Sequence, residues 1–116
     1  MNKIPLYSDE EHELLGLLVE DNNSWIAQTV FGYVIERTTS RKAAEAVLRQ
    51  QGLRYLSGVW QYFDSDEQDW FPCILKDITE NRVTIIRTDS MGSEDPATYK
   101  MVTLLHPTEN TLIKSH

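Results

Sequence analysis

Apolar residues in the first half of the chain recur at spacings that predict helices rather than strands. Four leucines lie between residues 14 and 18, and Ser8 precedes Glu11 by three positions, which is the capping-box pattern of a helix start. Acidic residues in the first turn would also favour the positive end of the helix dipole. We therefore predict a first helix over residues 9–20.

Another helical pattern lies over residues 41–51, the third predicted helix in chain order, where alanine, valine and leucine side chains fall on one face. Thr39 or Ser40 is placed to cap its start. Gly52 is expected to end it in the left-handed conformation that glycine adopts readily. Small side chains on the inner face predict close packing of this helix on another element.

Residues 25–37 fit both a helix and a strand. Ile26, Val30 and Val34 fall near one helical face, whereas Gly32 and several β-branched residues disfavour a helix. Apolar side chains occupy both odd and even positions, so the alternation of a half-buried strand is missing. We favour a buried helix here and keep the strand as the alternative.

The second half of the chain predicts five strands, because aromatic and β-branched runs alternate with polar turns. Glu80 and Asn81 mark a tight hairpin turn, and Pro72, which has no N–H to donate, is expected at an edge or a bulge. A loop is expected over residues 89–96, and a helix over residues 97–105 is the alternative to the fourth strand. The predicted strands are residues 55–63, 70–77, 83–88, 98–105 and 111–114.

Helices followed by a run of antiparallel strands predict an α+β fold. The 116 residues suit one domain with one core. We expect a helical part at residues 1–53 and a strand-rich part at residues 54–116. Two or three N-terminal helices would then pack on a five-strand antiparallel SH3-like barrel or sheet.

Residues 58–89 contain Trp60 and the run Asp69-Trp70-Phe71-Pro72-Cys73 between turn signals. This arrangement resembles SH3-like small β-barrel domains, and more narrowly those of the Tudor type. The resemblance implies a binding module, and some Tudor-type domains hold a methylated side chain in an aromatic cage by cation–π attraction. Trp60 and Trp70 would match two cage walls, whereas residues 86–90 lack the third aromatic that such a cage needs.

The net charge of −7 narrows the choice of partners. Residues 58–116, with ten acidic and five basic side chains, carry most of it. A surface of this sign repels nucleic-acid phosphate and anionic lipid. It suits a basic protein partner, or it serves only to keep the protein soluble.

The most acidic segment of the strand-rich part runs directly into two aromatic residues, and we take it as the candidate site for a protein partner. Its alternating carboxylates also suggest a calcium loop, but the glycine and the closing glutamate of such a loop are missing. We therefore predict no metal here. The candidate partner-binding residues are Asp64, Asp66, Glu67, Asp69, Trp70 and Phe71.

Catalytic motifs are not evident. Cys73 stands in an apolar strand, where cysteine usually acts as a small hydrophobic residue. A single cysteine forms no intramolecular disulfide, and we see no nucleophile–base pair, phosphate-binding glycine loop or spaced set of metal ligands. We predict no catalytic residue, no cofactor and no metal. The basic residues that could contact nucleic acid gather at the third predicted helix: Arg37, Arg41, Lys42, Arg49 and Arg54.

The sequence thus favours a small acidic, non-enzymatic binding or adaptor protein with a protein partner. One alternative is a small-molecule binder or enzyme with a pocket between helices and sheet, and another is nucleic-acid binding through the third helix. The acidic N-terminus and the lack of a long apolar run predict a cytoplasmic protein. The Leu-rich first helix and an unpaired sheet edge predict a homodimer, with a monomer as the alternative.

Overall fold

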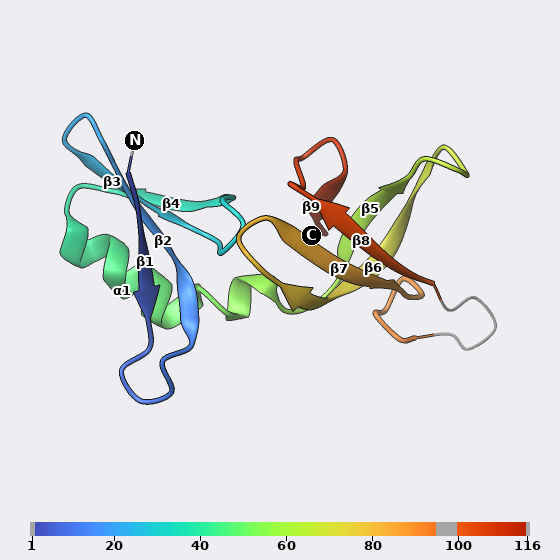
Figure 1. Cartoon of the computed structure of the whole chain (residues 1–116), viewed down its shortest axis with the longest axis horizontal. Helices are drawn as coiled ribbons and strands as arrows, with labels where there is room; N and C mark the ends of the chain where they lie inside the picture. Colours follow the sequence, from blue (N-terminus) through green and yellow to red (C-terminus); the bar gives the residue numbers. More distant parts are fainter. Residues whose placement is uncertain (1, 95–99, 116) are drawn as a thin grey trace. The chain divides into compact units, whose positions relative to one another are not determined.

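The computed structural model describes residues 2–94 and 100–115 and consists mainly of two antiparallel sheets (Figure 1). The chain divides into two compact units, Met1–Leu56 and Ser57–His116, close to the predicted boundary between its two parts. The prediction of a single domain over residues 1–116 stays a prediction. In chain order the elements are β1 (Lys3–Tyr7), β2 (Leu14–Asp21), β3 (Ser24–Gln28), β4 (Val34–Thr38), α1 (Arg41–Gln51), the 3-10 helix η1 (Arg54–Leu56), β5 (Trp60–Asp64), β6 (Asp69–Ile78), β7 (Arg82–Arg87), β8 (Met101–Leu105) and β9 (Leu112–Lys114).

The first unit is a four-stranded meander in the order β1-β2-β3-β4, with α1 packed against β2, β3 and β4. Leu18 of β2 and Ala27 of β3 are paired neighbours, and both are fully buried. They form one cluster with the inner face of α1, which shields this apolar surface from water. The buried members of the cluster are Leu15, Leu18, Ala27, Ala44, Val47 and Leu48.

The helix predicted over residues 9–20 is wrong, because Leu14–Asp21 form strand β2. Residues 15–19 are all buried, so the apolar run serves both faces of the strand rather than one helical stripe. Ser8 does not cap a helix either. Its hydroxyl accepts a hydrogen bond from the N–H of Glu13 at 3.0 Å and closes the β1–β2 loop.

Residues 25–37 are strands β3 and β4, so the strand alternative is right and the favoured helix is wrong. The alternation is hidden in the sequence because the β3–β4 register shifts between Ala27 and Gln28. The connecting turn is held by Thr29, whose side chain accepts from the N–H of Tyr33 at 2.9 Å. Gly32 supplies the positive φ of 95° that this turn requires.

The third predicted helix is confirmed as α1, and Ser40 caps it by accepting from the N–H of Ala43 at 3.1 Å. Gly52, however, adopts a right-handed conformation with φ −49°, so the predicted left-handed ending is wrong. Glycine is required there for a different reason. A Cβ atom at position 52 would lie 2.4 Å from the backbone oxygen of Leu15, so only glycine lets the end of α1 approach β2 this closely.

The second unit contains one five-stranded antiparallel sheet in the order β8-β7-β6-β5-β9. Its strands agree with the five predicted from sequence, although β5 begins only at Trp60 because Arg54–Leu56 form η1. The fourth strand is confirmed over Met101–Leu105, which excludes the helix alternative for those residues. The loop predicted over residues 89–96 and the start of that strand extend into residues 95–99, which lie outside the described part of the chain.

These findings correct the predicted fold class. The chain is mostly β, with α1 as its one α-helix among the described residues and with two separate antiparallel sheets. It does not have two or three N-terminal helices packed on a five-strand SH3-like barrel or sheet. The reason is that apolar runs buried on both faces look alike in a helix and in a strand.

Pro72 lies in β6, a central strand, rather than at the predicted edge or bulge. Its carbonyl accepts from the N–H of Thr88 at 2.9 Å, so its backbone polar atoms point toward the β7 side. Strand β7 ends at Arg87, and the missing N–H of Pro72 therefore interrupts no regular ladder bond. The proline is tolerated because the neighbouring strand is shorter than β6.

Glycine at position 16 is a strict requirement of the first unit. A Cβ atom there would lie 2.3 Å from the backbone oxygen of Gln28 and 2.8 Å from Cδ2 of Leu48. We expect Gly16→Ala to lower the free energy of unfolding by about 3 kcal/mol, as overpacking of a tight interior does. Urea denaturation followed by circular dichroism measures this loss.

Gly32→Ala is the matched control in the same unit. The nearest atom to an added Cβ there is the flexible Nζ of Lys3 at 3.2 Å, so the positive φ is the main penalty, about 1 kcal/mol. Equal losses in the two variants would show that the contact of position 16 with β3 and α1 is not the constraint.

Candidate functional site

The candidate acidic segment forms the β5–β6 hairpin, in which Asp64 and Asp69 are the last paired residues of the two strands. Asp64 is the anchor of the connecting loop. Its Oδ1 accepts the backbone N–H groups of Asp66 at 2.9 Å and Glu67 at 3.2 Å. The side chain is buried, with a relative exposure of 5%, so Asp64 shapes the loop and does not present its charge to a partner.

Lys100, which lies 36 residues later in the sequence, neutralises this buried carboxylate. The Nζ of Lys100 donates to Oδ2 of Asp64 at 2.5 Å, and the hydroxyl of Tyr62 lies 3.3 Å from the same oxygen. The hydrogen bond from Lys100 is the main reason why the pKa of Asp64 falls to about 2. The same bond raises the pKa of Lys100, while burial raises that of Tyr62.

Arg87 contacts two further residues of the candidate site, Glu67 and Phe71. Its Nη1 donates to Oε2 of Glu67 at 2.7 Å, and its guanidinium carbon lies 3.4 Å from the ring centre of Phe71. This places a cation over an aromatic face and beside a carboxylate at the same time. Glu67 and Phe71 are therefore engaged within the second unit and are less available to a partner.

Four of the six predicted residues are exposed, and among the described residues only Glu67 of these four forms an ion pair. Asp66 and Asp69 are exposed and form no ion pair among the residues that the structure describes. Trp70 is 36% exposed and packs edge to face on Phe63, with ring centres 5.6 Å apart. The available part of the hairpin is thus two carboxylates and one supported indole ring.

Sequence reasoning found the hairpin residues but missed Arg87 and Lys100. Glu67 and Arg87 are 20 residues apart, and Asp64 and Lys100 are 36 residues apart. No local pattern signals contacts over such separations, since only the order of the strands brings these residues together. The hollow beside Asp64 and Lys100 measures about 140 Å³, which is below the range of drug-sized ligand pockets.

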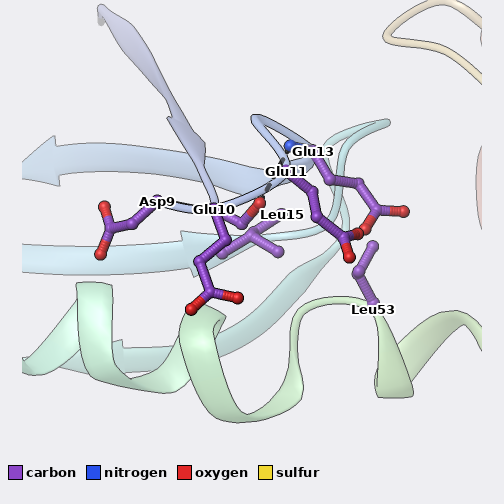
Figure 2. Close-up of a pocket in the computed structure, with 7 residues that line it drawn as sticks. Asp9, Glu10, Glu11, Glu13, Leu15 and Leu53 are labelled. Atoms are coloured by element: carbon purple, nitrogen blue, oxygen red, sulfur yellow. Dashed lines mark hydrogen bonds between the residues drawn. The ribbon is translucent and has the colours of Figure 1, made fainter.

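A second acidic surface lies at the β1–β2 loop of the first unit, where the sequence predicted the start of a helix (Figure 2). It surrounds a pocket of about 350 Å³ with apolar atoms from Leu15 and Leu53. Among the described residues, Asp9 is the one carboxylate here that forms an ion pair, with its Oδ2 3.6 Å from Nη1 of Arg49. The acidic side chains that line this acidic pocket are Asp9, Glu10, Glu11 and Glu13.

The acidic pocket does not have the arrangement of a metal site. No group of three or more His, Cys, Asp or Glu side chains within residues 2–94 and 100–115 is placed to hold a metal ion. Figure 2 shows the carboxylate of Asp9 directed away from those of Glu11 and Glu13. Such spread carboxylates suit contact with a basic side chain better than the compact oxygen shell of a cation.

The basic group at the third predicted helix is largely neutralised. Arg37 pairs with Asp21 at 3.3 Å, and Arg41 pairs with Glu45 at 3.1 Å. Arg49 faces the carboxylate of Asp9, as described above. These pairs reduce the positive field that phosphate binding requires, so the nucleic-acid alternative gains no support from the structure.

Cys73 and Trp60 are fully buried in the core of the second unit. Burial raises the pKa of the Cys73 thiol to about 12, which leaves essentially no thiolate at neutral pH. The cysteine therefore acts as the small hydrophobic residue that the sequence predicts. Trp60, with no exposed surface, does not form a wall of a methyl-ligand cage.

Comparison with protein families, curated proteins and solved structures finds no match to this chain. No helix in the described part of the chain is long and apolar enough to cross a membrane.

Asp64→Asn tests the anchor of the hairpin. The carboxyl of Asp64 has a pKa of about 2 in the folded protein and near 4 in an unfolded chain. Its stabilising contribution is therefore complete above about pH 4 and is lost as the pH falls toward 2. We expect the variant to melt below the wild type at pH 7, with the difference shrinking between pH 4 and pH 2.

Thermal melting across this pH range measures the effect, and Asp66→Asn is the control because Asp66 is exposed and, among the described residues, forms no ion pair and acts on Lys100 only through a minor charge interaction. Its melting difference should be small and should not follow the titration of Asp64. A pH-independent difference for Asp64→Asn would contradict the assigned Lys100 pair.

Cys73 should resist thiol reagents in the folded protein. With the thiol buried and its pKa near 12, reaction with Ellman's reagent at pH 8 should be more than about a hundredfold slower than in denaturant. The absorbance of the released thiolate follows the reaction. Rapid stoichiometric labelling of the native protein would show that this strand opens readily or that Cys73 is accessible.

Proposed function

We propose that this protein is a small non-enzymatic binding protein that recognises a basic protein partner. The observation that carries the proposal is Trp70, exposed on the β5–β6 hairpin and close in sequence to the exposed carboxylates of Asp66 and Asp69. Exposed tryptophans are typical anchors of protein interfaces. Neighbouring carboxylates would select a partner of positive charge and speed its association.

The remaining candidate residues prepare the hairpin for binding. Asp64 holds the loop through two backbone hydrogen bonds, and Glu67 is held by Arg87. A loop already fixed in one conformation loses less entropy when a partner binds. Asp64, Glu67 and Phe71 are therefore positioning residues in this proposal, while Asp66, Asp69 and Trp70 make the contact.

The acidic pocket also favours a partner of positive charge. Its carboxylates surround apolar atoms of Leu15 and Leu53, which are both part of the first unit. A lysine or arginine side chain has this combination in reverse, with a charged head on an apolar stem. The pocket thus provides a second contact for a basic surface, consistent with the net charge of −7.

The resemblance of residues 58–89 to Tudor-type binding modules agrees with a binding role and belongs to this proposal. A methylated ligand does not, because Trp60 is fully buried. A cytoplasmic location is also part of the proposal, since the single cysteine is buried and reduced.

Neutralising the contact residues tests the proposal. Asp66→Asn combined with Asp69→Asn should slow association with the captured partner about tenfold, because electrostatic steering is lost. Trp70→Ala should mainly speed dissociation, since it removes an interface anchor. Partners captured from lysate on immobilised wild-type protein are identified and purified, and their rates are measured by surface plasmon resonance at two salt concentrations.

Asp77→Asn combined with Glu80→Gln is the matched control, because it removes the same number of exposed carboxylates near the end of β6 and in the β6–β7 turn of the same unit. The control should bind as the wild type does. If both double variants slow association equally, net charge rather than the hairpin attracts the partner. A partner whose binding is unaffected by every hairpin variant would refute the proposed site.

A further inference from the structure

The four edge strands of the two sheets are protected to different degrees. Edge strands expose unpaired backbone groups, and proteins usually block them with proline, charge or short length. Pro5 lies in β1, a glutamate and an arginine lie in β4, and β9 has only three residues. Strand β8 has none of these features: its sequence is MVTLL, and its register with β7 is regular.

The hydrogen bonds at the two ends of β8 establish which backbone groups of the strand face β7 and which face away from it. The carbonyl of Lys100 accepts from Arg87 at 2.9 Å, and the N–H of His106 donates to Asn81 at 2.6 Å. In an antiparallel pair, alternate residues face the same neighbour, so even-numbered residues from 100 to 106 face β7. The backbone groups of the intervening residues point away from β7: Met101, Thr103 and Leu105.

The side chains of these three residues are exposed as well. Met101 is 54% and Leu105 is 71% exposed, and both are apolar. The hydroxyl of Thr103 forms a hydrogen bond with the hydroxyl of Thr84, with the two oxygen atoms 3.1 Å apart, on the same face of the sheet. Among residues 2–94 and 100–115 the outward backbone groups of β8 have no hydrogen-bond partner, so the edge presents them together with apolar side chains that water solvates poorly.

We propose that β8 is the interface through which two copies of this chain pair edge to edge. An antiparallel register centred on Thr103 places Met101 of one copy opposite Leu105 of the other. In this register every outward N–H of the strand meets an outward carbonyl. Apolar side chains face apolar side chains, threonine faces threonine, and the uncharged strand brings no like charges into direct opposition.

This self-complementarity favours a second copy over a foreign peptide. The pairing has twofold symmetry, which is the commonest symmetry of homo-oligomers, and it joins two five-stranded sheets into one. The uncharged strand also has no means of selecting a basic partner, which the acidic hairpin is proposed to bind. The partner site on the hairpin and the dimer interface at β8 therefore use different residues. An experiment that rejects one of them leaves the other unaffected.

The strength of the pairing follows from its size and from the charge of the chain. A contact between five-residue strands buries less than a standard interface, so we expect a weak dimer that forms only at raised protein concentration. Each copy carries a net charge of −7, and screening weakens the resulting repulsion. Added salt should therefore strengthen the dimer, opposite to its effect on a basic partner.

Sedimentation equilibrium from about 5 to 500 μM at low and high salt tests the dimer. The wild-type mass should rise with concentration from 13.4 kDa toward twice that value, and further at high salt. Met101→Lys combined with Leu105→Lys should remain monomeric while keeping the native circular dichroism spectrum. These substitutions reduce the net negative charge, so loss of the dimer would not result from greater repulsion.

The matched control is Val34→Lys combined with Met91→Lys, which makes the same charge change at exposed apolar residues outside β8. It should dimerise at least as well as the wild type. A wild type that stays monomeric up to 500 μM, or a β8 variant that still dimerises, would overturn the proposal. A dimer lost only in the control would place the interface elsewhere.

Amide hydrogen exchange measured by NMR at low and high protein concentration reads the register directly. Protection of the Met101, Thr103 and Leu105 amides should rise with concentration, because only these point outward. The amides of Val102 and Leu104 already face β7 and should change little. Equal changes at all five positions would reject edge pairing.

Discussion

The ion pair between the buried carboxylate of Asp64 and Lys100 is the interaction on which the organisation of the second unit depends. The carboxylate holds the β5–β6 loop through backbone hydrogen bonds and receives the ammonium group of Lys100 at 2.5 Å. Because Lys100 directly precedes β8, one ion pair connects the acidic hairpin with the start of the free sheet edge. A buried charge without a partner is costly, so the fold requires the hairpin and β8 to stay together.

Two kinds of binding are thus proposed for one small sheet. The hairpin offers charge and an exposed indole, which in the proposed function would select a partner by its electrostatic potential. The edge strand offers backbone hydrogen bonds and apolar side chains, which in the proposed dimer would select a second copy by geometry. Salt is expected to weaken the first association and to strengthen the second, so under both proposals the protein would exchange one for the other as ionic strength rises.

The candidate site was only partly readable from the sequence. The run from Asp64 to Phe71 stood out by composition, and its residues do lie together on one hairpin. Their roles were not readable, because Arg87 and Lys100 arrive from distant strands and engage Glu67, Phe71 and Asp64. The acidic pocket was missed for a related reason, since its acidic residues also form a plausible first turn of a helix.

By itself, the sequence determined the local elements whose signals are carried by neighbouring residues. Helix α1 with its Ser40 cap and the strand-rich character of the second half belong to this class. Only the tertiary structure decided that Leu14–Asp21 is a strand, because burial on both faces removes the periodicity that distinguishes strand from helix. It also decided the glycines at positions 16 and 52, which are required by close contacts between β2, β3 and α1. Such contacts depend on how elements pack, and no stretch of neighbouring residues encodes them.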